Sequence, residues 1–167
     1  MSERKTIYIE TTIPSYVTGK PSRDVLTAFR QNISRYFWEN ERHNFDLFSS
    51  KYVEEECSKG DKEAAKRRTD FIKELPYLSE TEEVIKLAEV YFDLLNIPPK
   101  ARMDSFHIAL CVAHKIDYLL SWNFTHLGHD SEMELRSYNN GQGIFTPRLL
   151  TVDNLLQIIE EERNGLT

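Results

Sequence analysis

The chain has 167 residues, of which 40% are hydrophobic and 11% aromatic, so it is long enough to bury one core, and we expect a single domain spanning residues 1–167. No apolar run reaches the ~18 residues of a membrane span, and the start of the chain lacks the apolar run of a signal peptide, so we expect a cytoplasmic protein without membrane contact. The formal net charge of −6 gives no overall sign of nucleic-acid binding, which would have to depend on a local patch.

Strands and helices alternate in the first half of the chain. Residues 6–10 predict a strand by their alternation, and Pro14 breaks the chain after it. A helix is predicted from about Ser22 to Arg42, with one apolar face made of Leu26, Phe29, Ile33 and Phe37. Residues 45–50 predict a second strand, which is followed by a short helix and by another that Asp61 caps.

The same alternation continues to the end of the chain. The remaining predicted elements are a short strand at 77–79, helices at 81–95 and 103–115, a buried strand at 117–121, a last strand at 143–146 and a helix from about Thr151. Strands that alternate with helices predict an α/β layer architecture with a mainly parallel sheet and right-handed crossovers.

Oxygen-bearing side chains occur where the predicted strands end. Glu10 closes the first strand, residues 54–56 are glutamates in the helix after the second, and Asn123 follows the strand at 117–121. Asp104 opens the helix before that strand. Because the carboxyl ends of parallel strands meet at one edge of a sheet, these side chains could converge there.

A cluster of carboxylates repels itself unless a cation neutralises it. Mg²⁺ and Mn²⁺ prefer such an all-oxygen setting. A metal held there can orient a water, lower its pKa and offset charge on a phosphodiester, which is the chemistry of metal-dependent nucleases.

Helical spacing distinguishes the three glutamates. Val53 and Cys57 are four residues apart and are predicted to face the core, so Glu56 lies at the border of the buried stripe. Glu54 and Glu55 are predicted to be solvated.

Four segments, "YIETTIPSY", "VEEECSKGD", "DSFHIAL" and "DYLLSWNFTH", cover most of the chain from residue 6 to about 126. In their order and spacing they together resemble the PIN domain, the fold of VapC-like toxins and related endoribonucleases. The resemblance implies a PIN-like three-layer fold, with a central mainly parallel sheet flanked by helices. It also implies a Mg²⁺- or Mn²⁺-dependent endoribonuclease that acts on RNA, an antitoxin partner and a homodimer.

The resemblance also implies roles for single residues. Glu10, Glu56 and Asp104 correspond to the first three acids of the family, and Thr11 to the adjacent hydroxyl. The chain departs from the family in two places, because the first acid is usually Asp and because the fourth acidic position holds the amide Asn123.

Each candidate also has a plainer interpretation. Glu10 could be a strand end paired with a lysine, although its burial without a partner would be costly. Asp104 could be a helix N-cap without any role in a metal site, and Glu56 could be a solvated surface acid. His107 lies one turn beyond Asp104 and is more simply a structural hydrogen-bonding group, while His126 could contact phosphate or metal or lie on a surface loop.

The best local basic patch follows Glu56 in the sequence. It consists of Lys59, Lys62, Lys66, Arg67 and Arg68, and it fits either an RNA contact or an exposed helix face. The leading hypothesis is a PIN-class endoribonuclease whose metal is bound by Glu10, Glu56, Asp104 and Asn123. The alternatives are a catalytically degenerate PIN scaffold that binds RNA or a protein and, less favoured, a small-molecule phosphohydrolase.

Overall fold

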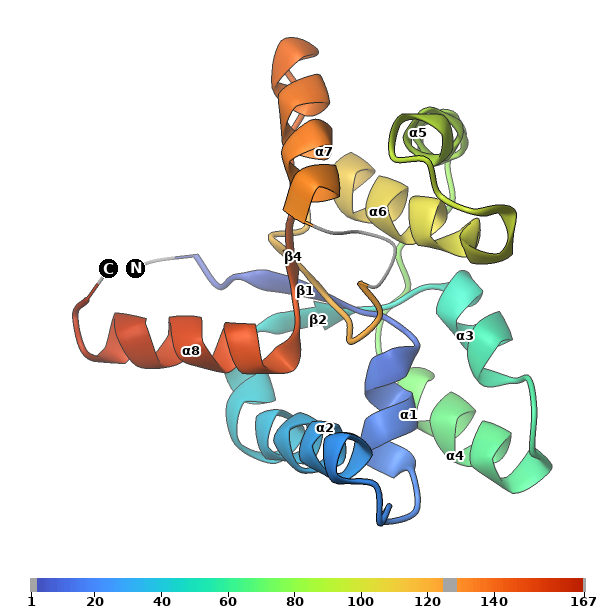
Figure 1. Ribbon diagram of the computed structural model, residues 1–167, viewed down its shortest axis with the longest axis vertical. Helices are drawn as coiled ribbons and strands as arrows, with labels where there is room; N and C mark the ends of the chain where they lie inside the picture. The colour runs from blue at the N-terminus through green and yellow to red at the C-terminus, as the bar shows by residue number, and fades with distance from the viewer. Residues whose placement is uncertain (1–2, 125–128, 167) are drawn as a thin grey trace.

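Four short parallel strands form the centre of the molecule in the computed structural model, which describes residues 3–124 and 129–166 (Figure 1). The strands are β1 (Thr6–Ile9), β2 (Asp46–Phe48), β3 (Tyr118–Leu120) and β4 (Arg148–Leu150), in the order β2-β1-β3-β4. Every neighbouring pair is parallel, and Ile9 lies opposite Leu120. The prediction of an α/β fold with a mainly parallel sheet is therefore confirmed.

Helices cover the sheet on both sides. They are α1 (Thr12–Thr18), α2 (Val25–Tyr36), α3 (Lys51–Cys57), α4 (Lys62–Ile72), α5 (Glu82–Leu94), α6 (Met103–Ala113), α7 (His129–Gly141) and α8 (Val152–Arg163). In Figure 1, α5, α6 and α7 lie above the sheet, while α1, α2 and α8 lie below it. A π-helical turn at Phe37–Glu41 and 3-10 turns at Arg42–Asn44 and Pro99–Ala101 complete the helical segments of the described residues. No described helix has the length and apolar character that a membrane crossing needs.

The first helix contradicts the expectation that Pro14 would break the chain. Pro14 is the third residue of α1, where it is buried. The N–H groups of a first helical turn have no partner within the helix, so proline removes no hydrogen bond at this position. The turn residues around Gly19 therefore mark the end of this helix, and the chain does not break at Pro14.

The apolar face predicted for the second helix is divided in the structure. α2 begins after its N-cap Asp24, whose side chain accepts a hydrogen bond from the Thr27 N–H. Phe37 is fully buried, but Leu26 and Phe29 are 55% and 46% exposed. The side of α2 that packs on α1 instead carries polar Gln31, which bonds to the backbone of the segment between the two helices.

Two other predicted elements are wrong in detail. The last strand is β4 and not residues 143–146, and residues 77–79 contribute only an isolated bridge from Tyr77 to Ser49. α7 was not predicted at all. The helix expected from Thr151 is present as α8, with Thr151 at its N-cap.

Candidate active site

Glu10 is a buried carboxylate at the carboxyl end of β1, only 6% exposed. Its Oε2 accepts hydrogen bonds from the Thr12 N–H at 3.0 Å, the Thr12 hydroxyl at 2.6 Å and the Ser121 hydroxyl at 2.6 Å. These donors supply the partners that an ionised carboxylate needs when it is removed from water. Three hydrogen bonds therefore anchor Oε2 of Glu10.

Glu56 is directed toward the same edge of the sheet. Val53 and Cys57 are fully buried on α3, as the helical spacing predicted, and Glu55 is exposed. Glu56 Oε1 accepts a hydrogen bond from the Thr11 hydroxyl at 2.9 Å and lies 2.7 Å from His107 Nε2. Thr11 directly follows Glu10, so these contacts bring α3 beside the end of β1.

His107 is the centre of a buried chain of hydrogen bonds. Its side chain is 3% exposed, and its Nδ1 lies 2.6 Å from the Tyr8 hydroxyl, which in turn lies 2.8 Å from the Ser50 hydroxyl. Ser50 accepts a hydrogen bond from Val53 N–H and caps α3. The chain Ser50–Tyr8–His107–Glu56 thus joins β1, α3 and α6, so His107 has the structural hydrogen bonds that the sequence suggested and contacts a candidate catalytic acid as well.

The pKa values of the two partners shift in opposite directions. Burial alone would lower the pKa of His107, but the hydrogen bond and charge of Glu56, with the charges of Glu10 and Asp104, hold it above its ordinary value. Burial would raise the pKa of Glu56, but His107 and the Thr11 hydroxyl hold it below its ordinary value. Both shifts favour an imidazolium–carboxylate pair, which places a positive charge among the acids.

This pair predicts a pH window for stability in EDTA. Since the Glu56 pKa is lowered, its contribution is present above its ordinary pKa of 4.5 and is lost as the pH falls through the lowered value. Since the His107 pKa is raised, its contribution is present below its ordinary pKa of 6.5 and is lost as the pH rises through the raised value. We expect the melting temperature of the wild type to exceed that of Glu56→Gln most between pH 4.5 and 6.5. A difference that does not vary with pH would contradict the ion pair.

Asp104 and Asn123 reach the same site from two other elements. Asp104 is the second residue of α6, whose N-cap is Arg102, so it does not occupy the cap position. Asn123 follows β3, and its N–H donates to the Ser121 hydroxyl at 2.9 Å. One small cavity is lined by Glu10, Asp104, His107, Ile108, Leu119, Ser121, Asn123 and Phe124. Three of the four predicted ligands therefore share a cavity, and the fourth, Glu56, contacts the His107 that lines it.

The side chains at this cavity, which has a volume of about 10 Å³, include the oxygen donors of a cation site. Among the residues that the structure describes, no three His, Cys, Asp or Glu side chains lie close enough together to hold a metal ion by themselves. Mg²⁺, however, is usually bound through one or two carboxylates and several waters. Glu10 and Asp104, with the amide oxygen of Asn123, form a set of this kind, so the donor chemistry agrees with Mg²⁺ or Mn²⁺.

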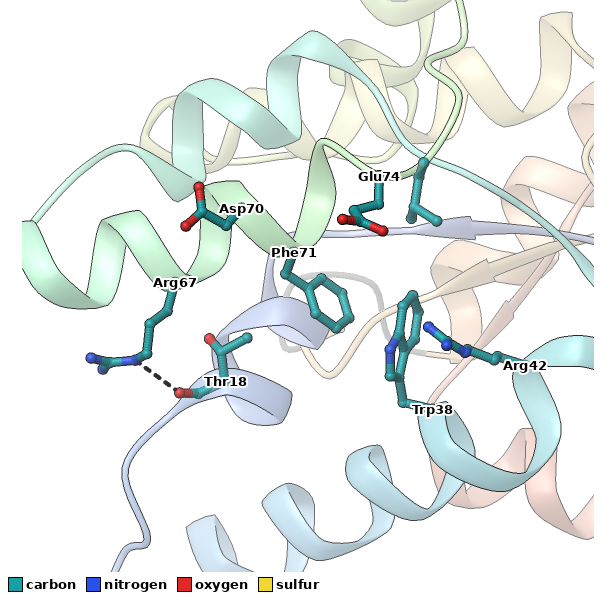
Figure 2. Close-up of a pocket in the computed structure, with 8 residues that line it drawn as sticks. Thr18, Trp38, Arg42, Arg67, Asp70, Phe71 and Glu74 are labelled. Carbon is teal, nitrogen blue, oxygen red and sulfur yellow. Dashed lines mark hydrogen bonds between the residues drawn. The ribbon is translucent and has the colours of Figure 1, made fainter.

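The predicted basic run mainly makes contacts within the protein. Lys66 pairs with Asp70, and Arg68 donates to the carbonyls of Cys57 and Lys59. Figure 2 shows Arg67 donating to the Thr18 carbonyl, at 3.0 Å, beside a cavity of about 610 Å³. None of the candidate acids lines this cavity. Lys59 and Lys62 are exposed, and the nucleic-acid contact proposed for the run stays a prediction.

One predicted residue lies outside the described residues, namely His126. Sequence reasoning in turn missed the residues that hold the acids in place, which are Tyr8, Thr12, Ser50 and Ser121. The place of Ser121 near Glu10 could have been predicted, because Ser121 directly follows β3, the neighbour of β1 in the sheet. No sequence pattern predicts the contact of Tyr8, because its partner His107 lies 99 residues away in the sequence.

Comparison with known proteins identifies the fold. No protein-family model matches the chain, and no curated protein matches it. Among solved structures, it is similar to a chain of the crystal structure of VapBC2 from Rickettsia felis bound to a DNA fragment from their promoter. The identity is 13% and the TM-score 0.50, and the match covers 87% of this chain and 98% of the other. At this identity the likeness concerns the fold alone: the chain has a PIN-like α/β fold, with its candidate acids at the carboxyl edge of the sheet.

Proposed function

We propose that the protein is a Mg²⁺- or Mn²⁺-dependent endoribonuclease of the PIN class and the toxin of a toxin–antitoxin pair. The observation that carries the proposal is the convergence of Glu10, Asp104 and Asn123 on one cavity, with Glu56 anchored beside it. These residues come from four elements and meet at the edge where ligands bind in parallel sheets.

The protein's own residues would position the metal and the substrate phosphate. Thr12 and Ser121 fix Oε2 of Glu10, and Thr11 and His107 fix Oε1 of Glu56, so each carboxylate is oriented before any ligand binds. The hydrogen bond and charge of His107, with the Thr11 hydroxyl, hold the pKa of Glu56 below its ordinary value although burial would raise it. When bound, the cation supplies a water of lowered pKa and offsets charge on the phosphodiester.

Cleavage of a defined single-stranded RNA with and without chelator tests the proposal. We expect cleavage in Mg²⁺, none in EDTA, and recovery when excess Mn²⁺ is added. Glu56→Gln should lose activity, while Glu55→Gln, an exposed acid on the same helix, should retain it. Cleavage that persists in EDTA, or that depends on Glu55 instead of Glu56, would contradict the proposal.

A second candidate is a PIN scaffold that binds RNA or a protein without cleaving. It is favoured by the neutral Asn123 at the fourth acidic position and by the absence, among the described residues, of a three-ligand metal cluster of His, Cys, Asp or Glu. Binding of RNA without cleavage at any Mg²⁺ concentration would support this candidate over the nuclease.

Asn123→Asp tests the departure from the family pattern. A carboxylate adds a negative charge that a neutral amide lacks, and charge dominates the affinity for hard dications. We therefore expect several-fold tighter Mg²⁺ binding, measured by calorimetry on chelator-stripped protein, and faster cleavage at limiting Mg²⁺. The gain should disappear at saturating metal. An unchanged affinity would remove Asn123 from the ligand set.

We extend the proposal to an antitoxin partner and a homodimer. Its support is the similar solved chain, which belongs to a structure described as VapBC2 bound to a promoter DNA fragment. Light scattering on the purified chain, alone and with the product of the adjacent reading frame, tests both assemblies. A chain that is monomeric alone and stays monomeric when that product is added would contradict both the homodimer and the antitoxin complex.

A further inference from the structure

Three aromatic rings and one arginine form a half-exposed cluster on α1, α2 and the segment after β3. We call Tyr16, Phe29, Arg30 and Trp122 the aromatic platform. The Trp122 ring lies 6.2 Å from that of Tyr16 and 6.4 Å from that of Phe29, both in edge arrangements. The Arg30 guanidinium lies 5.4 Å from the Trp122 ring centre and donates to the Tyr16 hydroxyl at 3.2 Å.

The platform is joined to the candidate active site by direct contacts. Trp122 precedes Asn123 in the chain. The backbone N–H of Trp122 donates at 2.9 Å to the Thr12 hydroxyl, which in turn donates to the Glu10 carboxylate. Tyr16 lies one helical turn beyond Thr12 on α1. The indole N–H of Trp122 donates to Ser34 on α2, so the ring is fixed in orientation. The platform therefore adjoins the candidate active site through Trp122 and Thr12.

The platform also lies in a basic part of an otherwise acidic chain. Residues 11–38 contain four basic side chains, Lys20, Arg23, Arg30 and Arg35, and one acidic side chain, Asp24, in a protein of net charge −6. The Asp24 carboxylate is used to cap α2. Within the described residues, Arg30 forms no ion pair, and its buried Nε has no hydrogen-bond partner. Phe29, which precedes Arg30 in the chain, remains 46% exposed.

We infer that the aromatic platform binds bases of single-stranded RNA next to the acidic site, an inference that rests on the proposed function. Aromatic rings beside an arginine are a usual surface for unpaired bases, which stack on the rings while the cation attracts the backbone. The positive charge of this segment favours a polyanion over an uncharged apolar peptide. The exposed part of α2 that the sequence assigned to the core would then contact substrate.

Binding of a labelled single-stranded RNA of about ten nucleotides, followed by fluorescence anisotropy in EDTA, tests the inference. We expect Phe29→Ala to weaken binding by about fivefold or more, which is the typical loss of one stacked base. Arg30→Gln should reduce the slope of log affinity against log salt by about 0.7, the value for one phosphate contact on a single strand. The matched controls Phe145→Ala and Lys86→Gln, both exposed and remote from the platform in sequence, should bind as the wild type does.

Trp122 provides a second measurement that does not depend on removing a platform residue. The chain has two tryptophans, so Trp38→Phe leaves Trp122 as the sole indole reporter. Stacking of a base should quench its fluorescence saturably, with the dissociation constant that anisotropy gives. The quenching should weaken in the same proportion when Phe29→Ala is added.

The outcomes separate this inference from the nuclease proposal. RNA that binds through the platform without being cleaved in Mg²⁺ supports the inference and overturns the nuclease. Cleavage with RNA affinity that is unchanged in Phe29→Ala and Arg30→Gln overturns the inference and supports the nuclease. In that case a protein partner is the better occupant of the exposed face of α2. Trp122 fluorescence that does not respond to saturating RNA also contradicts the inference.

Discussion

Asp104→Asn is expected to reduce metal-dependent RNA cleavage by about 100-fold or more, because loss of a metal-ligating carboxylate exceeds the usual loss from a supporting residue. The same variant should melt within a few degrees of the wild type in EDTA. Asp104 and Glu10 line the same cavity, so removing one negative charge relieves repulsion there. Initial cleavage rates at saturating Mg²⁺ and melting curves in EDTA measure the two effects.

Asp153→Asn is the matched control for this substitution. Asp153 is the second residue of α8 as Asp104 is of α6, so both carboxylates lie in the first turn of a helix. Asp153→Asn should cleave RNA as the wild type does. Full activity in Asp104→Asn, or an equal loss in both variants, would remove Asp104 from the site.

His107→Ala should lower the free energy of unfolding by about 3 kcal/mol, because it leaves the Tyr8 hydroxyl and the Glu56 carboxylate without their shared partner. Glu56 is 30% exposed, so water compensates part of its loss and the effect stays below that of a fully buried pair. In a chain of this length such a change lowers the melting temperature by about 6–12 °C. Thermal melting in EDTA near pH 6 measures it.

Two substitutions show whether the effect belongs to the hydrogen-bonded chain. His114→Ala removes the histidine at the end of the same helix, whose Nε2 lies 2.8 Å from the Ser79 carbonyl, and should lower stability by about 1 kcal/mol. His107→Gln, which keeps hydrogen-bonding groups, should fall between His107→Ala and the wild type. Equal decreases of the free energy of unfolding in His107→Ala and His114→Ala would mean that the buried series of hydrogen bonds adds no stability of its own.

The sequence predicts the sheet and the acids because both depend on short-range patterns. Alternation in residues 6–10 indicates β1, and the spacing of Val53 and Cys57 orients Glu56. Parallel pairing then requires the ends of β1 and β3 to adjoin, which places Glu10 near Asn123. These steps use only local periodicity and one topological rule.

The hydrogen-bond network is not predictable in this way. The contact between His107 and Glu56 joins residues 51 apart, and it depends on side-chain conformations that no periodicity encodes. The sequence predicts a break at Pro14, which lies in the first turn of α1, because a single sequence does not reveal the position of a proline within a helix. The face of α2 was misassigned because Gln31 satisfies backbone groups and is therefore buried, whereas Leu26 is not.

Anomalous diffraction from crystals soaked in Mn²⁺ tests most directly the claim that these acids form a metal centre. We expect one strong peak at the cavity that Glu10, Asp104 and Asn123 line, and its loss in Asp104→Asn crystals. A peak elsewhere, or no peak at this cavity in a protein that still cleaves RNA, would contradict the account.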